Sequence, residues 1–126
     1  MQQISDYELE LMKIIWAKGG TAMYAEIAAA LEAKGTPWTK NTIVTLLSRL
    51  TAKGYLNTHK TGFRNQYTAA VSVMDYQENE TISLLDKLYE GNAKGLVSML
   101  VQKDLISPKD YEELREHWDE SEVHNE

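Results

Sequence analysis

A row of polar side chains within Thr39–Lys53 has the chemistry needed to contact nucleic acid. The guanidinium of Arg49 could bond guanine through two donors, and the amide of Asn41 could do likewise with adenine. Val44 could meet a thymine methyl group, and the hydroxyl groups suit bases or phosphates. The DNA-contacting residues predicted in this stretch are Lys40, Asn41, Thr42, Val44, Thr45, Ser48 and Arg49. The alternative is that they are ordinary solvated positions.

The positive charge of the chain is concentrated around this stretch. The 126 residues have a net charge of −6, yet residues 33–74 contain six Lys or Arg and no Asp or Glu. Residues 1–74 have a net charge of +3, and residues 75–126 a net charge of −9. This asymmetry indicates one part that contacts a polyanion and another with a different role. In the acid-free region, Lys60 and Arg64 are predicted phosphate contacts, and Lys53 is a candidate C-terminal helix cap.

The sequence lacks the residue patterns of catalytic and metal sites. The absence of cysteine excludes disulfides, thiolate metal sites and cysteine nucleophiles. The histidines, His59, His117 and His124, share no ligand spacing with one another or with carboxylates. No glycine-rich phosphate loop or nucleophile motif is present. We therefore predict no enzyme activity, no metal site and no cofactor.

The hydropathy of the chain predicts a cytoplasmic protein that does not insert into membranes. No run of about 18 apolar residues is present, as a membrane-spanning helix would require. The first ten residues lack the basic and apolar regions of a signal peptide.

Two predicted helices position the polar row. Within Thr39–Lys53, apolar residues recur at the spacing i, i+3, i+4 and i+7 of one helix face, namely Ile43, Leu46, Leu47 and Leu50. Thr39 can cap the start of this helix, and Gly54 can end it in a left-handed conformation. A helix over Ala22–Lys34, capped by Thr21, precedes it. Two helices joined by a short turn are typical of a helix-turn-helix, although two merely packed helices would show the same pattern.

A β-hairpin is predicted directly after the helix pair. Tyr55–His59 and Gln66–Ala69 are short β-prone runs, with Gly62 in the turn between them. Another helix comes first in the chain, with Ser5 as its N-cap and Gly19-Gly20 at its end. Three helices followed by a hairpin wing predict a winged helix-turn-helix domain over residues 1–74.

The second part of the chain, residues 75–126, is predicted to be a helical dimerisation domain. Helical periodicity returns from about Met74 and indicates three short helices, followed by an acidic tail from Asp119 that we expect to fray. Such helices carry more apolar side chains than they can bury among themselves, which favours an identical chain as partner. The predicted dimer contacts are Leu85, Leu88, Tyr89, Leu96, Leu100, Tyr111, Leu114 and Trp118. The fold class is therefore mainly α.

These features together predict a protein that binds double-stranded DNA as a homodimer. A winged-helix module that binds proteins is one alternative, with the acidic second part as its contact surface. A repressor released by a small-molecule ligand is another, although the sequence gives no indication of a ligand pocket.

The chain resembles the penicillinase-repressor family of bacterial transcription regulators, the BlaI/MecI type. The segments that carry the resemblance are ISDYELELMKIIW (Ile4–Trp16), TKNTIVTLLSRLTAKGYL (Thr39–Leu56), the G-x-x-x-x-Y hairpin (Gly62–Tyr67), LLDKLYEGNAKGLVSMLV (Leu84–Val101) and EELRE (Glu112–Glu116). The resemblance implies a winged-helix homodimer that represses transcription by occupying a palindromic operator and whose C-terminal helices interlock. On this basis we predict a dimeric DNA-binding transcriptional repressor. The resemblance also implies, for antibiotic-responsive members, a membrane sensor-protease system that triggers cleavage of the repressor in its C-terminal region.

Two features depart from the family pattern. The family's cleaved bond is typically Asn-Phe, and Met99-Leu100 stands at the corresponding place here. The copper-responsive branch ends in Cys-x-Cys motifs, whereas this chain has no cysteine.

Overall fold

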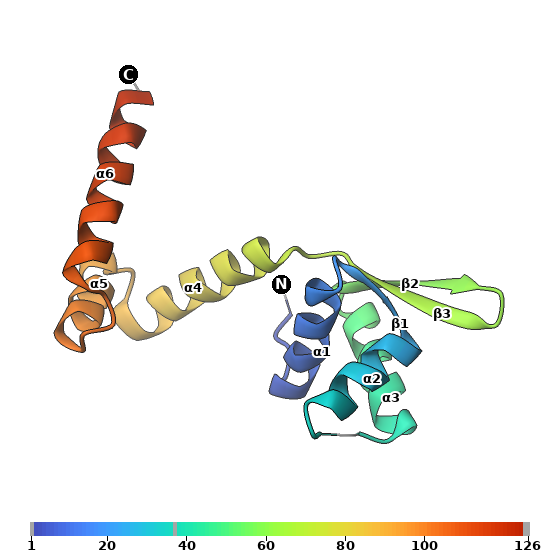
Figure 1. The fold of residues 1–126 in the computed structure, drawn as a ribbon. Helices are drawn as coiled ribbons and strands as arrows, with labels where there is room; N and C mark the ends of the chain where they lie inside the picture. Colours follow the sequence, from blue (N-terminus) through green and yellow to red (C-terminus); the bar gives the residue numbers. More distant parts are fainter. Residues whose placement is uncertain (1, 37, 125–126) are drawn as a thin grey trace. The chain divides into compact units, whose positions relative to one another are not determined.

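A computed structural model describes residues 2–36 and 38–124 of the chain. The elements in order are α1 (Asp6–Ala17), β1 (Thr21–Met23), α2 (Tyr24–Ala33), α3 (Lys40–Ala52), β2 (Leu56–Thr61), β3 (Arg64–Ala69), α4 (Val73–Tyr89), α5 (Ala93–Gln102) and α6 (Pro108–His124) (Figure 1). The chain forms two compact units, and the division between them falls after Gln77, inside α4. The mainly helical fold class and the winged helix-turn-helix are confirmed. The domain boundary at 74/75 stays a prediction.

The first unit has one hydrophobic core between its three N-terminal helices and its sheet. The apolar face predicted for α3 is buried, and it packs against apolar residues of α1, α2 and the sheet. The largest fully buried side chains are Leu11, Met12, Ile15, Ile27, Leu31, Ile43, Leu47, Leu50, Tyr55 and Leu56. This burial fixes which face of α3 remains available to a partner.

The sheet has three antiparallel strands in the order β1-β3-β2. β1 was not predicted: Thr21 was expected to cap a helix beginning at Ala22. Instead Thr21 and Ala22 pair with β3 opposite Thr68 and Tyr67, and Ala22 is buried. α2 therefore begins only at Tyr24, where the Glu26 carboxylate accepts a hydrogen bond of 3.0 Å from the Met23 amide.

The hairpin is longer than predicted and forms the wing. β2 and β3 pair from Leu56↔Ala69 out to Thr61↔Arg64, which leaves Gly62 and Phe63 as the turn. Gly62 has a φ of 67°, as the first central residue of a type II′ turn requires. Tyr55 lies outside the strand and is buried, and its hydroxyl donates to the Gln2 carbonyl at 2.6 Å. Figure 1 shows the wing extending beyond the three helices.

The second unit is helical throughout its regular structure, but α4 and α6 are not short. Each has 17 residues, because neither helix contains a glycine. α4 contains no proline, and Pro108 of α6 is the first residue of that helix, where proline is tolerated. The tail expected to fray from Asp119 continues as helix to His124, and residues 125–126 lie outside the described part. Across 78–120, where side chains are described, none is buried. Among the described helices, none is both long and apolar enough to cross a membrane.

Candidate nucleic-acid interface

The exposed face of α3 carries all seven residues that the sequence analysis placed there. Lys40, Asn41, Thr42, Val44, Thr45, Ser48 and Arg49 are exposed. The four apolar residues of the opposite face are buried, so the helix is divided into a core side and a polar side. The structure therefore presents these side chains together on one surface, and their contact with DNA stays a prediction.

Three interactions fix the start of α3. Thr39 is the N-cap as predicted, and its hydroxyl accepts a hydrogen bond of 3.3 Å from the Thr42 amide. The Thr39 and Thr42 hydroxyl oxygens are also 2.9 Å apart, so the Thr42 hydroxyl is shared with the cap. Next to the cap, the Trp38 ring packs edge-on against Tyr7 of α1, with 5.1 Å between ring centroids. The turn before α3 is thereby held against α1.

The end of α3 is fixed by an ion pair that the sequence did not predict. Lys53 is the C-cap of α3, as predicted, and its backbone N–H donates to the Arg49 and Thr51 carbonyls. Its ammonium also binds the Glu8 carboxylate at 2.9 Å and the Gln3 carbonyl at 3.0 Å. Glu8 also accepts from the Ser5 amide, in the capping box that was predicted for α1. Burial favours the neutral acid, but hydrogen bonds from Lys53 and Ser5 outweigh it and lower the pKa of Glu8.

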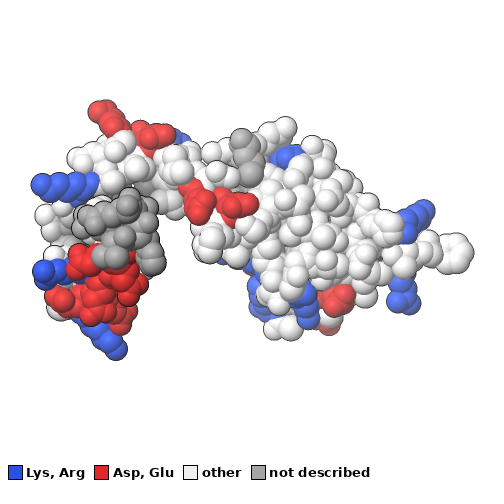
Figure 2. All heavy atoms as spheres, turned by 90° about the horizontal axis from the view of Figure 1, so that it is seen from above, with Lys and Arg blue, Asp and Glu red and all other residues white. Residues whose placement is uncertain are grey.

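The wing carries cations on both strands near its tip. Lys60 on β2 and Arg64 on β3 are exposed on the predicted hairpin, and their contact with phosphates stays a prediction. Phe63 in the turn is also fully exposed, which the sequence analysis did not anticipate. Figure 2 shows Lys and Arg in blue at the wing end of the first unit, and Asp and Glu in red gathered on the second unit.

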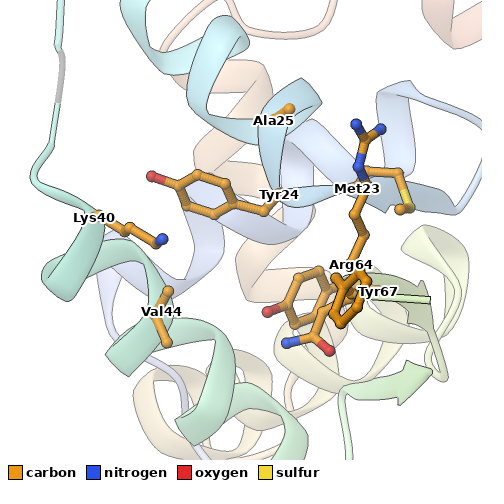
Figure 3. Close-up of a pocket in the computed structure, with 9 residues that line it drawn as sticks. Met23, Tyr24, Ala25, Lys40, Val44, Arg64 and Tyr67 are labelled. Atoms are coloured by element: carbon orange, nitrogen blue, oxygen red, sulfur yellow. The ribbon is translucent and has the colours of Figure 1, made fainter. Parts of the chain in front are cut away.

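A groove of about 360 Å³ lies between the wing and the starts of α2 and α3 (Figure 3). We call it the wing groove; its lining residues are Met23, Tyr24, Ala25, Lys40, Val44, Phe63, Arg64, Asn65 and Tyr67. The Lys40 ammonium lies over the Tyr24 ring, 5.9 Å from its centroid, so an aromatic face orients this cation. The groove brings three predicted contact residues, Lys40, Val44 and Arg64, into one concave surface.

The apolar residues predicted as dimer contacts fall into two groups. Leu88, Tyr111, Leu114 and Trp118 are well exposed, whereas Leu85, Tyr89, Leu96 and Leu100 are half-buried. Further exposed apolar side chains, which the sequence analysis did not select, are Ile82, Leu84, Val97, Val101 and Leu105. Within the described residues, no group of three or more His, Cys, Asp or Glu could hold a metal ion.

Comparison with known proteins gives consistent matches. The family described as Penicillinase repressor matches residues 4–120. A penicillinase repressor of Bacillus licheniformis is 38% identical over 89% of this chain and 86% of its own. The methicillin resistance regulatory protein MecI of Staphylococcus aureus is 33% identical over 90% of each chain. The solution structure of the DNA-binding domain of the repressor BlaI is 44% identical, with a TM-score of 0.51 over 59% of this chain and 88% of that one. This chain belongs to the penicillinase repressor family.

Proposed function

We propose that this protein is a homodimeric transcriptional repressor that binds a palindromic operator through α3 and the wing. The observation that carries the proposal is the exposed face of α3, which presents hydrogen-bonding groups and two cations without an acid. The names of the relatives, a penicillinase repressor and a resistance regulator, support the same role. The role is binding rather than catalysis, and it is exercised in the cytoplasm, where bacterial promoters are found.

Each side chain on this surface has a defined task in the proposal. α3 enters the major groove, where Arg49 and Asn41 read base edges through paired hydrogen bonds. Lys40, Lys60 and Arg64 bind phosphates, which position the protein without specifying sequence. The apolar face of α3 keeps the helix on the core, so the reading side chains are presented by a rigid element.

The second unit pairs with the second unit of an identical chain, and this pairing brings a second copy of the α3 surface to the DNA. Its exposed apolar side chains, among them Leu88 and Leu114, are buried when an identical chain covers them. Two copies of α3 then enter successive major grooves about 34–36 Å apart. Coupling raises the affinity, because the second half-site is met at high effective concentration.

Loosening the second unit releases the operator in this mechanism. The bond matching the family's cleavage site joins Met99 and Leu100 within α5, and both side chains are half-buried. A protease linked to a membrane sensor must therefore unwind α5 before it can cut there.

The test is a gel-shift measurement with the full chain. A duplex selected from a random pool by this protein is compared with an unselected duplex across a range of salt concentrations. We expect tight, salt-dependent binding of the selected duplex by a dimer and weaker, steeply salt-dependent binding of the unselected one. Failure to enrich any sequence, or affinity that does not respond to salt, would rule out the proposed function.

A further inference from the structure

The last turn of α3 contains Arg49, one of the side chains that the proposed function assigns to base reading. The final carbonyls of a helix have no partner within the helix, so its last turn opens more easily than its middle. A long side chain on such a turn reaches a base at a defined place only if the turn itself is held. The contacts that hold the end of α3 therefore affect how Arg49 can read sequence.

Backbone hydrogen bonds tie the last turn of α3 to the residues directly after it. The Lys53 amide donates to the Arg49 carbonyl at 2.9 Å, and the Tyr55 amide donates to the Leu50 carbonyl at 2.9 Å. The position of the Arg49 backbone therefore depends on how firmly Lys53 and Tyr55 are themselves held.

The side chains of Lys53 and Tyr55 are both anchored in the segment before α1. We call this segment, residues 2–5, the N-terminal strap. The Tyr55 hydroxyl donates to the Gln2 carbonyl at 2.6 Å, and the Lys53 ammonium donates to the Gln3 carbonyl at 3.0 Å. Gln2 and Gln3 are themselves exposed, so the strap contributes its main chain to these contacts.

The N-terminal strap is in turn fixed to the domain. Ile4 packs against the hydrophobic core, and the Ser5 amide donates to the Glu8 carboxylate at 2.9 Å. The same Glu8 oxygen accepts from the Lys53 ammonium at 2.9 Å, so the strap, α1 and the end of α3 meet at one buried acid. The ring of Tyr55 is buried as well. Both anchors of α3 therefore end on structure that is held in place.

The end of α3 also contacts the wing. The Thr51 hydroxyl lies 2.8 Å from the Thr58 hydroxyl of β2. This bond is exposed, and water can replace it at little cost, whereas the bonds of Tyr55 to the strap and of Lys53 to Glu8 are partly buried. The strap is therefore the firmer of the two restraints.

We propose that Lys53, Tyr55 and the N-terminal strap position Arg49 for base reading. The strap holds the two residues that close the last turn, and these residues hold the Arg49 backbone in place relative to α1. Without the strap the turn opens and Arg49 samples several orientations. That loss weakens a directional base contact more than contacts with phosphates. Lys53 and Tyr55 are thus positioning residues, and this inference rests on the proposed function.

The first part of the test measures whether the strap restrains α3 in the full chain. Tyr55→Phe removes the hydroxyl that donates to the Gln2 carbonyl but keeps the buried ring. Amide hydrogen exchange followed by NMR should be several-fold faster at positions 53 and 55 of this variant, with unchanged rates in the middle of α3. Exchange at positions 53 and 55 that equals that of the parent would overturn the strap as a restraint.

The second part measures sequence reading by gel-shift titration. The quantity compared is the ratio of the affinities for the selected and the unselected duplex. Loss of folded protein lowers both affinities alike and leaves this ratio unchanged, so a merely structural role does not alter it. We expect Tyr55→Phe and Lys53→Met each to lower the ratio several-fold. Lys34→Met removes the same charge from an exposed lysine that pairs with Glu10, and it should keep the parent's ratio.

A double-mutant cycle assigns the effect to Arg49. Arg49→Ala removes the side chain that the strap positions, so adding Tyr55→Phe to it should lower the ratio no further. A further several-fold fall in the double variant would show that Tyr55 acts through another contact, and the inference would be wrong. It would be equally wrong if Arg49→Ala alone kept the parent's ratio, because the strap would then have no base contact to position.

The outcomes separate this inference from the proposed function. If the parent protein discriminates between the duplexes and either Tyr55→Phe or Lys53→Met keeps its full ratio, the strap has no positioning role and the repressor stands. If Lys53→Met fails to fold, Tyr55→Phe decides alone, because it keeps the buried ring. A parent protein that binds both duplexes with equal affinity would defeat the proposed function itself.

Discussion

The Lys53 ammonium lies 2.9 Å from the Glu8 carboxylate and joins the end of α3 to the start of α1. Glu8 is only 3% exposed, and its Oε2 has no hydrogen-bond partner within the described part of the structure. The hydrogen bonds from the Lys53 ammonium and the Ser5 amide therefore have to offset the free-energy cost of burying this charged carboxylate. This pair holds the proposed reading helix against the rest of the domain.

Replacing Lys53 with methionine should lower the free energy of unfolding by about 1–3 kcal/mol near neutral pH, because a buried carboxylate loses its partner. The lowered pKa of Glu8 means that the pair stabilises the fold above the pKa of an unfolded glutamate. This stabilisation is lost as the pH falls through the folded-state pKa. The difference between parent and variant should therefore shrink in acid. Urea unfolding at about pH 7 and about pH 3 measures it.

Lys34→Met is the matched control for this experiment. Lys34 pairs with Glu10 at 3.7 Å, but both side chains are about half exposed. Exposed pairs contribute about 0–1 kcal/mol, so this variant should unfold nearly as the parent does. Equal destabilisation by the two substitutions would contradict the role assigned to burial at Glu8.

Arg49→Ala should reduce affinity for the selected duplex by about 1–3 kcal/mol, as expected for loss of a bidentate base contact. Its affinity for unselected duplex should fall much less. Lys60→Ala should weaken both duplexes alike and flatten the salt dependence, because phosphate contacts carry no sequence information. Gel-shift titrations at several salt concentrations distinguish the two. If Arg49→Ala weakens both duplexes equally, Arg49 reads no base.

Replacing Leu88 and Leu114 together with asparagine should convert the dimer to a monomer. Both side chains are about 60% exposed in the single chain, so the substitutions remove apolar area from the dimer contact with little change to the protomer. Sedimentation equilibrium measures the association. Phe63→Asn, a change at an even more exposed apolar residue on the wing, should leave the oligomeric state unchanged. A double variant that remains dimeric would show that the contact lies elsewhere.

A chain that ends at Gln77 should keep its fold but bind the selected palindrome far more weakly than the full chain. It retains Tyr76, whose ring contacts Trp16 and Tyr55, so the start of α4 still packs on the core. It lacks the second unit, so each half-site is bound independently. Circular dichroism checks the fold, and titration on whole and half sites checks the affinity. Equal affinity of the short and full chains for the palindrome would contradict the coupling.

The parts of the fold that could be predicted are those encoded locally. The period of Ile43, Leu46, Leu47 and Leu50 identifies α3 and its buried face, and Thr39 and Gly54 mark its ends. By contrast, Thr21–Met23 has no strand signal of its own and becomes β1 by pairing with Gln66–Thr68, more than 40 residues later. The pairing of Lys53 with Glu8 is equally distant in sequence. Contacts of this kind depend on the assembled fold rather than on residue spacing.

The same distinction applies to the candidate site. The polar face of α3 follows from its apolar face, so its seven residues could be selected from periodicity alone. The wing groove could not, because Tyr24, Lys40 and Arg64 come from three separate elements. Tyr24 lies where β1 passes into α2, and the late start of that helix places its ring beneath Lys40.

The short third strand has a consequence for how repressors of this kind can diverge. β1 supports β3 at Gln66–Thr68, whereas the outer pairs Lys60↔Asn65 and Thr61↔Arg64 extend beyond it. Inserting or deleting two residues in each strand there would keep the side chains at the tip on their present faces of the wing, whereas one residue in each strand would reverse them. Wing length can therefore evolve in steps of two residues per strand while α3 and the core stay constant. Operator choice could then shift between related genes through reach along the duplex as well as through base contacts.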